Sequence, residues 1–127
     1  MAVDWVRKIC LSLPHATESV QWGNDLVFKI GGKMFAVAAL EPGEVWLSFK
    51  CSPEVFSGLI ERRGIIPAPY LARAQWVALE TEDALRPAEL KPLLRDAYKL
   101  VLAKVPNKAR AALGATTAGA PSSRRSR

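Results

Sequence analysis

The chain has 127 residues, of which 50% are hydrophobic and 24% are charged, a balance typical of one soluble globular domain. These proportions exclude an intrinsically disordered chain, a collagen-like repeat and a coiled coil, and no apolar run approaches the roughly 18 residues that a membrane span needs. The formal net charge is +6, but residues 105–127 carry five bases and no acid. Residues 1–104 keep 13 bases and 12 acids, so the net charge of this part is only +1 and does not by itself indicate nucleic-acid binding.

The N-terminal residues lack a charged segment followed by a long apolar run, so we expect no secretory signal. Two cysteines, Cys10 and Cys51, are too few for a disulfide framework, and we expect free thiols in the cytoplasm. One histidine and two distant cysteines do not supply the clustered ligands of a zinc site. We therefore expect neither a metal nor a cofactor.

The first predicted element is a helix over residues 2–13, where apolar residues recur at helical spacing until Pro14 ends the pattern. Short strands come next, and we expect them over residues 19–22, 26–30, 33–40 and 45–50. Gly31 and Gly32 fit a tight hairpin because both tolerate positive φ. Strict alternation places Met34 and Ala36 on one face of their strand and Phe35 on the other.

A second helix is predicted to begin at Ser52 and Pro53, a good N-cap followed by a good first residue, and to stop near Gly64. The proline-broken segment 65–70 indicates a loop or a sheet edge, and residues 75–80 a last strand. We expect a turn over residues 87–90 and a final helix from about Pro92 to Lys104, because proline is awkward inside a helix.

This order of elements favours an α+β fold, with an antiparallel sheet, helices packed on one face, and the other face partly open to water. We expect one domain over residues 1–105. Residues 106–127 are small and polar with a basic end, and they cannot bury enough surface to offset their ordering entropy. We therefore predict a disordered basic tail there.

An ordered set of short motifs resembles the MmcQ/YjbR family over about residues 3–105. In chain order the motifs are Leu11-Ser12-Leu13-Pro14, Thr17-Glu18, Trp22-Gly23, Val27-Phe28-Lys29, Gly32-Lys33-Met34-Phe35-Ala36, Leu47-Ser48-Phe49-Lys50-Cys51, Ile66-Pro67-Ala68-Pro69-Tyr70, Trp76-Val77-Ala78-Leu79 and Ala97-Tyr98-Lys99-Leu100-Val101. His15 stands where the family often has glycine, so no family role transfers to it. The resemblance implies a YjbR-like α+β domain that shares its architecture with secretion chaperones. It also implies a DNA-binding module, through a motif proposed as a double wing.

The residues themselves allow a nucleic-acid surface. If Leu47 and Phe49 face the helices, alternation turns Trp46 and Lys50 outward, with Lys29 on the same open face. An aromatic ring among cations is what base stacking combined with phosphate contact needs. The candidate residues are Lys29, Lys33, Trp46, Lys50, Arg62, Arg63, Arg73 and Trp76. The alternative is that the 65–75 loop covers both tryptophans and that the lysines are ordinary solvated charges.

Two other classes of function stay open. The same sheet face, with Tyr70 and Trp76, would suit a protein-interaction adaptor. A small-molecule pocket between sheet and helix would draw on Glu18, Trp22, Tyr70 and Tyr98, with Lys33 nearby, although an ion pair of Glu18 with a lysine that fixes the connector is the simpler interpretation. Cys51, between a strand and a helix start, is the one thiol to test for reactivity.

Our sequence-based hypothesis is a monomeric, non-enzymatic module that makes weak, salt-sensitive contacts with DNA, helped by the tail. A protein partner and an unknown small ligand are the alternatives, and we expect no association with membranes.

Overall fold

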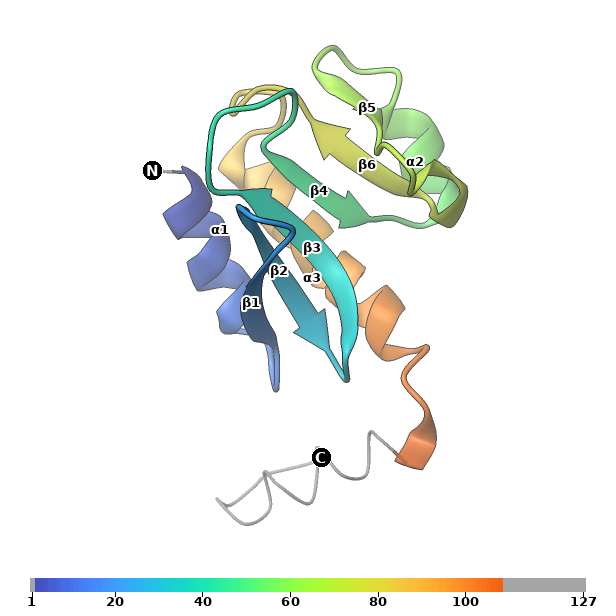
Figure 1. Ribbon diagram of the computed structural model, residues 1–127. Helices are drawn as coiled ribbons and strands as arrows, with labels where there is room; N and C mark the ends of the chain where they lie inside the picture. The colour runs from blue at the N-terminus through green and yellow to red at the C-terminus, as the bar shows by residue number, and fades with distance from the viewer. Residues whose placement is uncertain (1, 109–127) are drawn as a thin grey trace.

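Three helices pack on one side of an antiparallel sheet in the computed structural model, which describes residues 2–108 (Figure 1). The helices are α1 (Ala2–Leu11), α2 (Pro53–Leu59) and α3 (Pro87–Leu102). The strands are β1 (Thr17–Gln21), β2 (Asp25–Ile30), β3 (Lys33–Ala39), β4 (Leu47–Lys50), β5 (Ile65–Pro67) and β6 (Trp76–Leu79). Their order in the sheet is β1-β2-β3-β4-β6-β5, which confirms the predicted α+β class.

The predicted disorder of the tail falls, from residue 109 onward, outside the described residues. Within residues 2–108, none of the helices combines the length and the apolar character needed to cross a membrane.

The predicted hairpin between β2 and β3 is confirmed. Gly31 and Gly32 both have positive φ, at 60° and 81°, as a tight two-residue loop requires. The strands on either side pair antiparallel from Asp25 opposite Ala39 to Ile30 opposite Lys33. Glycine at both positions therefore fixes the register of the central strands.

A β-bulge in β3 breaks the alternation that the sequence predicts. Phe28 pairs with Ala36 and Lys29 pairs with Met34, so Phe35 is an extra residue in its strand. As a result Phe35 and Ala36 are both fully buried in the core on the helix side. The ring of Phe35 lies 6.4 Å from that of Phe28, centroid to centroid. The sequence-based assignment of Phe35 to the opposite face was wrong.

The start of α2 follows the prediction. The Ser52 hydroxyl accepts a hydrogen bond from the Val55 backbone N–H at 3.3 Å, and Pro53 occupies the first helical position. The helix is shorter than expected and ends at Leu59. The segment that reads as a loop or an edge contains β5, an edge strand in which Pro67, at its end, is tolerated.

Helix α3 starts five residues earlier than predicted and runs through Pro92. Its start is fixed by Glu89, whose carboxylate accepts a hydrogen bond from the Arg86 backbone N–H at 3.2 Å. Leu90, in the same turn, is buried in the core. Because Pro92 comes early in the helix, only one backbone bond near its beginning is lost, and packing of the apolar face outweighs this cost.

Apolar clusters lie on both sides of the sheet. The larger one fills the space between the sheet and the helices, around Phe28, Phe35, Phe49 and Leu94. The smaller one lies on the opposite face and consists of Ala68, Trp76 and Ala78, with Met34, Val37, Val45, Ile66 and Leu71 packed against them. The segment between β5 and β6 therefore covers part of the face that the sequence predicts to be open.

Candidate nucleic-acid interface

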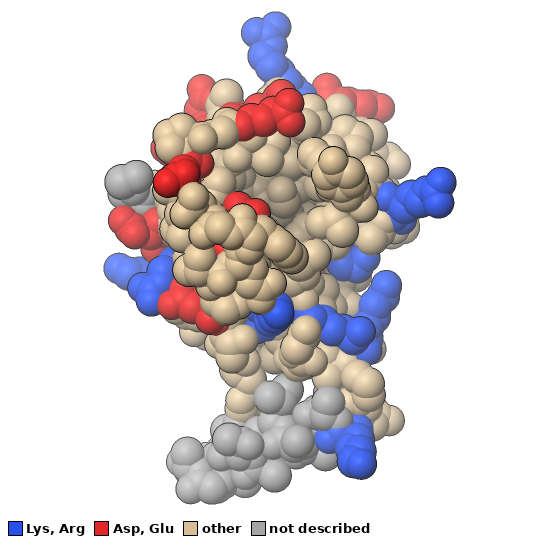
Figure 2. Space-filling view, viewed as in Figure 1, with Lys and Arg blue, Asp and Glu red and all other residues tan. Residues whose placement is uncertain are grey.

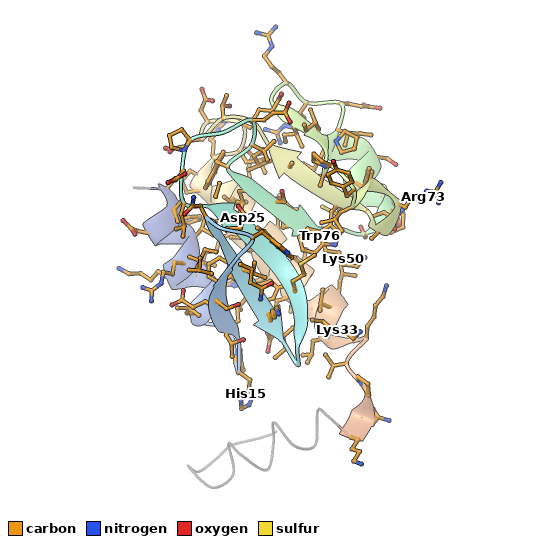
Figure 3. All side chains as sticks on the ribbon, in the orientation of Figure 1. His15, Asp25, Lys33, Lys50, Arg73 and Trp76 are labelled. Carbon is orange, nitrogen blue, oxygen red and sulfur yellow. The ribbon has the colours of Figure 1, made fainter. Side chains whose placement is uncertain are left out.

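Basic side chains gather along one side of the sheet. Lys50 ends β4, Arg73 lies in the short 3₁₀ turn Ala72–Ala74 before β6, and Lys33 begins β3. Figure 3 shows these three residues on the same side of the molecule. In Figure 2, Lys and Arg gather over the right and lower right of this view, whereas Asp and Glu gather mainly over its top and left. On the face that Figure 2 shows, basic and acidic side chains are thus partly separated, although single basic side chains also lie at its top and left edge.

Lys50 is the most constrained of these cations. Its Nζ donates a hydrogen bond to the Ala74 carbonyl oxygen at 2.6 Å, which ties β4 to the 3₁₀ turn. Partial burial lowers the pKa of Lys50, and the nearby positive charge of Lys104 lowers it further. Lys104 therefore approaches Lys50 from the end of α3. We call Lys33, Lys50, Arg73 and Lys104 the basic edge.

Trp76 lies beneath this region but is not available for stacking. It pairs with Lys50 across β4 and β6, yet it is only 4% exposed. Ala68 and Leu71 belong to the same apolar cluster and cover it from the loop between β5 and β6. Of the two interpretations, an exposed Trp76 was wrong, and the alternative in which the 65–75 loop covers Trp76 is confirmed. The indole completes a small second core.

Trp46 lies on the other side of the sheet from the expected one. It packs against the helix-side core, and its Nε1 donates to the Thr81 carbonyl oxygen at 2.8 Å. Strand β4 begins only at Leu47, and the Trp46 backbone N–H bonds to the same Leu79 that pairs with Leu47. This irregularity breaks the alternation, so Trp46 does not join Lys50.

The surroundings of Trp46 are also acidic. The indole shares a surface hollow with three acidic residues, namely Asp4, Glu41 and Glu82. A nucleic-acid phosphate would be repelled there. Both aromatic members of the predicted interface are thus removed from it.

Of the remaining candidate cations, Lys29 lies on the same face as the basic edge, whereas Arg62 and Arg63 lie beside acidic residues. Lys29 is half-buried on β2 opposite Met34, a residue of the second apolar cluster, so it shares a face with Lys50. Arg62 is engaged elsewhere, since its Nη1 lies 2.7 Å from Glu89 Oε2, and this hydrogen bond raises the pKa of Arg62. Arg63 lines a hollow with Glu80 and Asp83.

The residues predicted to form a pocket are not brought together. Glu18 accepts two hydrogen bonds from Arg7, at 2.7 and 2.6 Å, and this pairing lowers the pKa of the carboxyl group. Tyr98 is buried in the core. Tyr70 is fully exposed and Trp22 is 65% exposed, both at positive φ, so neither lines an enclosed cavity. Glu18 therefore forms an ion pair, as the simpler interpretation expects, but its partner is Arg7 on α1 and the expected lysine was wrong.

The model of the YjbR family matches residues 11–100, well over half of the chain. The chain belongs to the YjbR family. The uncharacterised protein YbdF of Escherichia coli O157:H7 is 25% identical over 103 residues, which cover 78% of this chain and 83% of that protein. The crystal structure of Deinococcus radiodurans protein DR2400, a DUF419 domain, is 31% identical with a TM-score of 0.77 and covers 88% of this chain and 87% of that one.

A protein from Pseudomonas syringae, 20% identical, shares the fold of this YjbR-family chain with a TM-score of 0.56, over 67% of this chain and 86% of that one. The names of these relatives indicate neither a substrate nor a ligand.

Both thiols of this YjbR-family chain are free and buried. Burial raises the pKa of both Cys10 and Cys51 to about 12, so the thiolate is scarce near neutral pH. Over the described residues, no group of three or more His, Cys, Asp or Glu side chains is placed to hold a metal ion.

Lys104 was not among the candidate site residues predicted from the sequence, where it was only the last residue of the predicted final helix. Its proximity to Lys50 depends on how α3 crosses the sheet, a long-range relationship that local spacing does not encode. A basic residue at the predicted helix end was the one available signal.

Proposed function

We propose that this chain is a non-enzymatic module that binds duplex DNA weakly, by contacts of the basic edge with the phosphate backbone. The observation that carries the proposal is the separation of charge in Figure 2, which leaves Lys33, Lys50 and Arg73 on a side from which most acidic side chains are displaced. Such a patch attracts a polyanion even when the net charge of the body is close to zero. The family resemblance leads to the same expectation.

The mode of binding follows from what the edge contains. Ammonium and guanidinium groups bind phosphate oxygens and position a protein on the duplex, but they do not read the sequence of bases. Trp46 and Trp76 are both engaged in packing, so the edge offers no indole on which a base would stack. The proposal is therefore binding to the duplex backbone without sequence preference and with a strong dependence on salt.

The direct test is a fluorescence-anisotropy titration of a short labelled duplex at low salt. Lys33→Gln and Arg73→Gln should each weaken binding by severalfold, because each removes one phosphate contact. The matched controls are Lys8→Gln on α1 and Arg95→Gln on α3, which are exposed and belong to the helix layer. Equal losses in edge and control variants would mean that net charge alone drives the binding.

The basic tail needs its own arm of the experiment. Replacing Arg124, Arg125 and Arg127 by Gln in the full chain removes the terminal cluster while leaving the described domain untouched. We expect weaker but measurable binding. Complete loss of binding in this variant, or no binding by the unaltered chain at low salt, would refute DNA binding by the domain.

A protein-interaction adaptor is the second candidate function, and one exposed apolar corner favours it. Val20, Trp22 and Leu40 are all exposed. The Leu40 backbone N–H bonds to Asn24, which places Leu40 beside the turn that carries Trp22. Exposed aromatic residues are frequent anchors in protein interfaces. A pull-down that recovers a specific partner equally with wild type and Trp22→Ser would count against this role.

A further inference from the structure

A cavity of about 270 Å³ lies where β4 passes into α2 and α3 crosses beside them. Its walls are apolar and come from Cys51, Val55, Leu93, Leu100 and Ala103. The other lining residues are Lys50, Ser52, Asp96 and Lys99. An apolar hollow with a few polar groups at its margin is the usual form of a small-molecule site.

We propose that this cavity binds a small amphipathic carboxylate, with its aliphatic chain against the apolar walls and its carboxylate at Lys50. The volume sets the size of the ligand. It corresponds to about nine molecules of liquid water at ~30 Å³ each, so a chain of about eight carbons suits it. This site is distinct from the pocket predicted from the sequence and does not depend on DNA binding.

The charges around the cavity favour a negatively charged ligand. Lys50 and Lys99 outnumber the one carboxylate, Asp96, among the lining residues, and Lys104 adds a further cation next to Ala103. The mutual repulsion of Lys50 and Lys104 contributes to the lowered pKa of Lys50. The Lys50 ammonium at the margin of the cavity attracts a carboxylate, whereas it repels an alkylammonium.

Lys50 is also held in a position to act as an anchor. Its Nζ donates one hydrogen bond to the Ala74 carbonyl oxygen at 2.6 Å. An ammonium group has three donors, so others remain for a ligand. The bond to Ala74 restrains a side chain that would otherwise lose much rotamer freedom on binding.

The same walls favour binding over chemistry. The Cys51 thiol is protonated near neutral pH, because burial raises its pKa to about 12. The Ser52 hydroxyl accepts the hydrogen bond that caps α2. Neither group is activated as a nucleophile, so the inference is a ligand site and not a catalytic one.

The test uses sodium octanoate as the probe and the full chain labelled with ¹⁵N. Titration followed by backbone amide shifts should show saturable changes at cavity residues such as Ser52, Leu93 and Ala103. Octylammonium has the same chain with the opposite charge, and acetate has the charge without the chain. Both should bind at least about tenfold more weakly than octanoate, since octylammonium lacks the carboxylate and acetate lacks the aliphatic chain.

Two variants locate the site. Lys50→Met keeps the apolar stem and removes the charge, and it should weaken octanoate by at least about tenfold, the effect of losing one charged hydrogen bond. Ala103→Leu extends a side chain into the cavity from the exposed C-cap residue of α3, whose φ near −61° leucine accepts, and it should weaken octanoate to a similar degree. Lys91→Met on the exposed surface of α3 is the matched control and should bind as wild type does.

The results that would overturn the proposal are equally specific. They are the absence of saturable shifts with octanoate, equal binding of octylammonium, or octanoate affinity unchanged in folded Ala103→Leu. If Lys50→Met fails to fold, the Ala103→Leu variant and the comparison of the two probes decide the question by themselves.

Discussion

The hydroxyl of Tyr98 donates a hydrogen bond to the Pro14 carbonyl oxygen at 2.6 Å, across 84 positions of the chain. The bond ties α3 to the connector that follows α1. The Tyr98 ring also meets Phe35 edge to face, with centroids 5.6 Å apart and an interplanar angle of 85°. One side chain thus joins the sheet, α3 and the connector.

Tyr98→Phe should lower the free energy of unfolding by about 1 kcal/mol, because the ring contact remains and the hydrogen bond is lost. Urea unfolding followed by tryptophan fluorescence measures this change. Tyr70→Phe is the matched control, since Tyr70 is fully exposed, and it should leave stability unaltered. A loss of equal size in both variants would show that the bond to Pro14 contributes nothing.

Gly31 and Gly32 form a second matched pair. Both have positive φ, so alanine at either position costs about 1–2 kcal/mol in backbone strain. A Cβ at Gly31 would in addition lie 2.7 Å from Val105 Cγ1, whereas nothing lies within 4 Å of one at Gly32. Overpacking should add about 1–3 kcal/mol for Gly31→Ala. Equal unfolding free energies for the two variants would contradict this close approach.

The contribution of Glu89 to the free energy of unfolding depends on pH. The pKa of Glu89 is lowered from 4.5 to about 2. The main cause is its hydrogen bond with Arg62, and the hydrogen bond from the Arg86 backbone N–H is the second cause. Because the pKa is lower in the folded state, the contribution is complete above about pH 4.5 and is lost as the pH falls toward about 2.

Chemical denaturation at several pH values tests this linkage. Across that window wild type should lose more stability than Glu89→Gln, which has no carboxylate to protonate. Glu44→Gln, in an exposed turn, serves as the control and should follow wild type. Parallel pH profiles of wild type and Glu89→Gln would refute the role of the Arg62 pair.

The burial of both thiols predicts slow modification. Cys10 and Cys51 should react with a thiol reagent at pH 8 far more slowly in the native protein than in urea, since burial holds the pKa of each at about 12. Rapid native reaction of Cys51 alone would restore it as a reactive candidate.

Local patterns in the sequence predicted much of the fold for identifiable reasons. The Gly31-Gly32 hairpin and the Ser52 N-cap depend on conformations that single residues impose, and both are confirmed. The prediction that the last helix starts at Pro92 was wrong, because packing of a long amphipathic helix outweighs one lost backbone hydrogen bond. The bulge at Phe35 depends on pairing between strands, which alternation along one strand does not reveal.

The candidate site was predicted less well, and the tryptophans explain why. Whether Trp46 and Trp76 face solvent depends on one irregular residue before β4 and on a loop that folds back over β6. Neither feature has a local signal. Figure 3 shows the candidate cations Lys33, Lys50 and Arg73 on one side of the molecule, and their role in binding nucleic acid stays a prediction. Long charged side chains remain near solvent wherever the backbone places them.

The salt dependence of duplex affinity tests the proposed DNA contact most directly. It should be measured in the chain with Arg124, Arg125 and Arg127 replaced by Gln, with and without the further changes Lys33→Gln, Lys50→Gln and Arg73→Gln. Four cations on phosphates predict a slope of log K against log salt of about −3 to −4, and the triple change of the edge should flatten it to about −1. A slope that the triple change leaves unaltered would contradict binding through the basic edge.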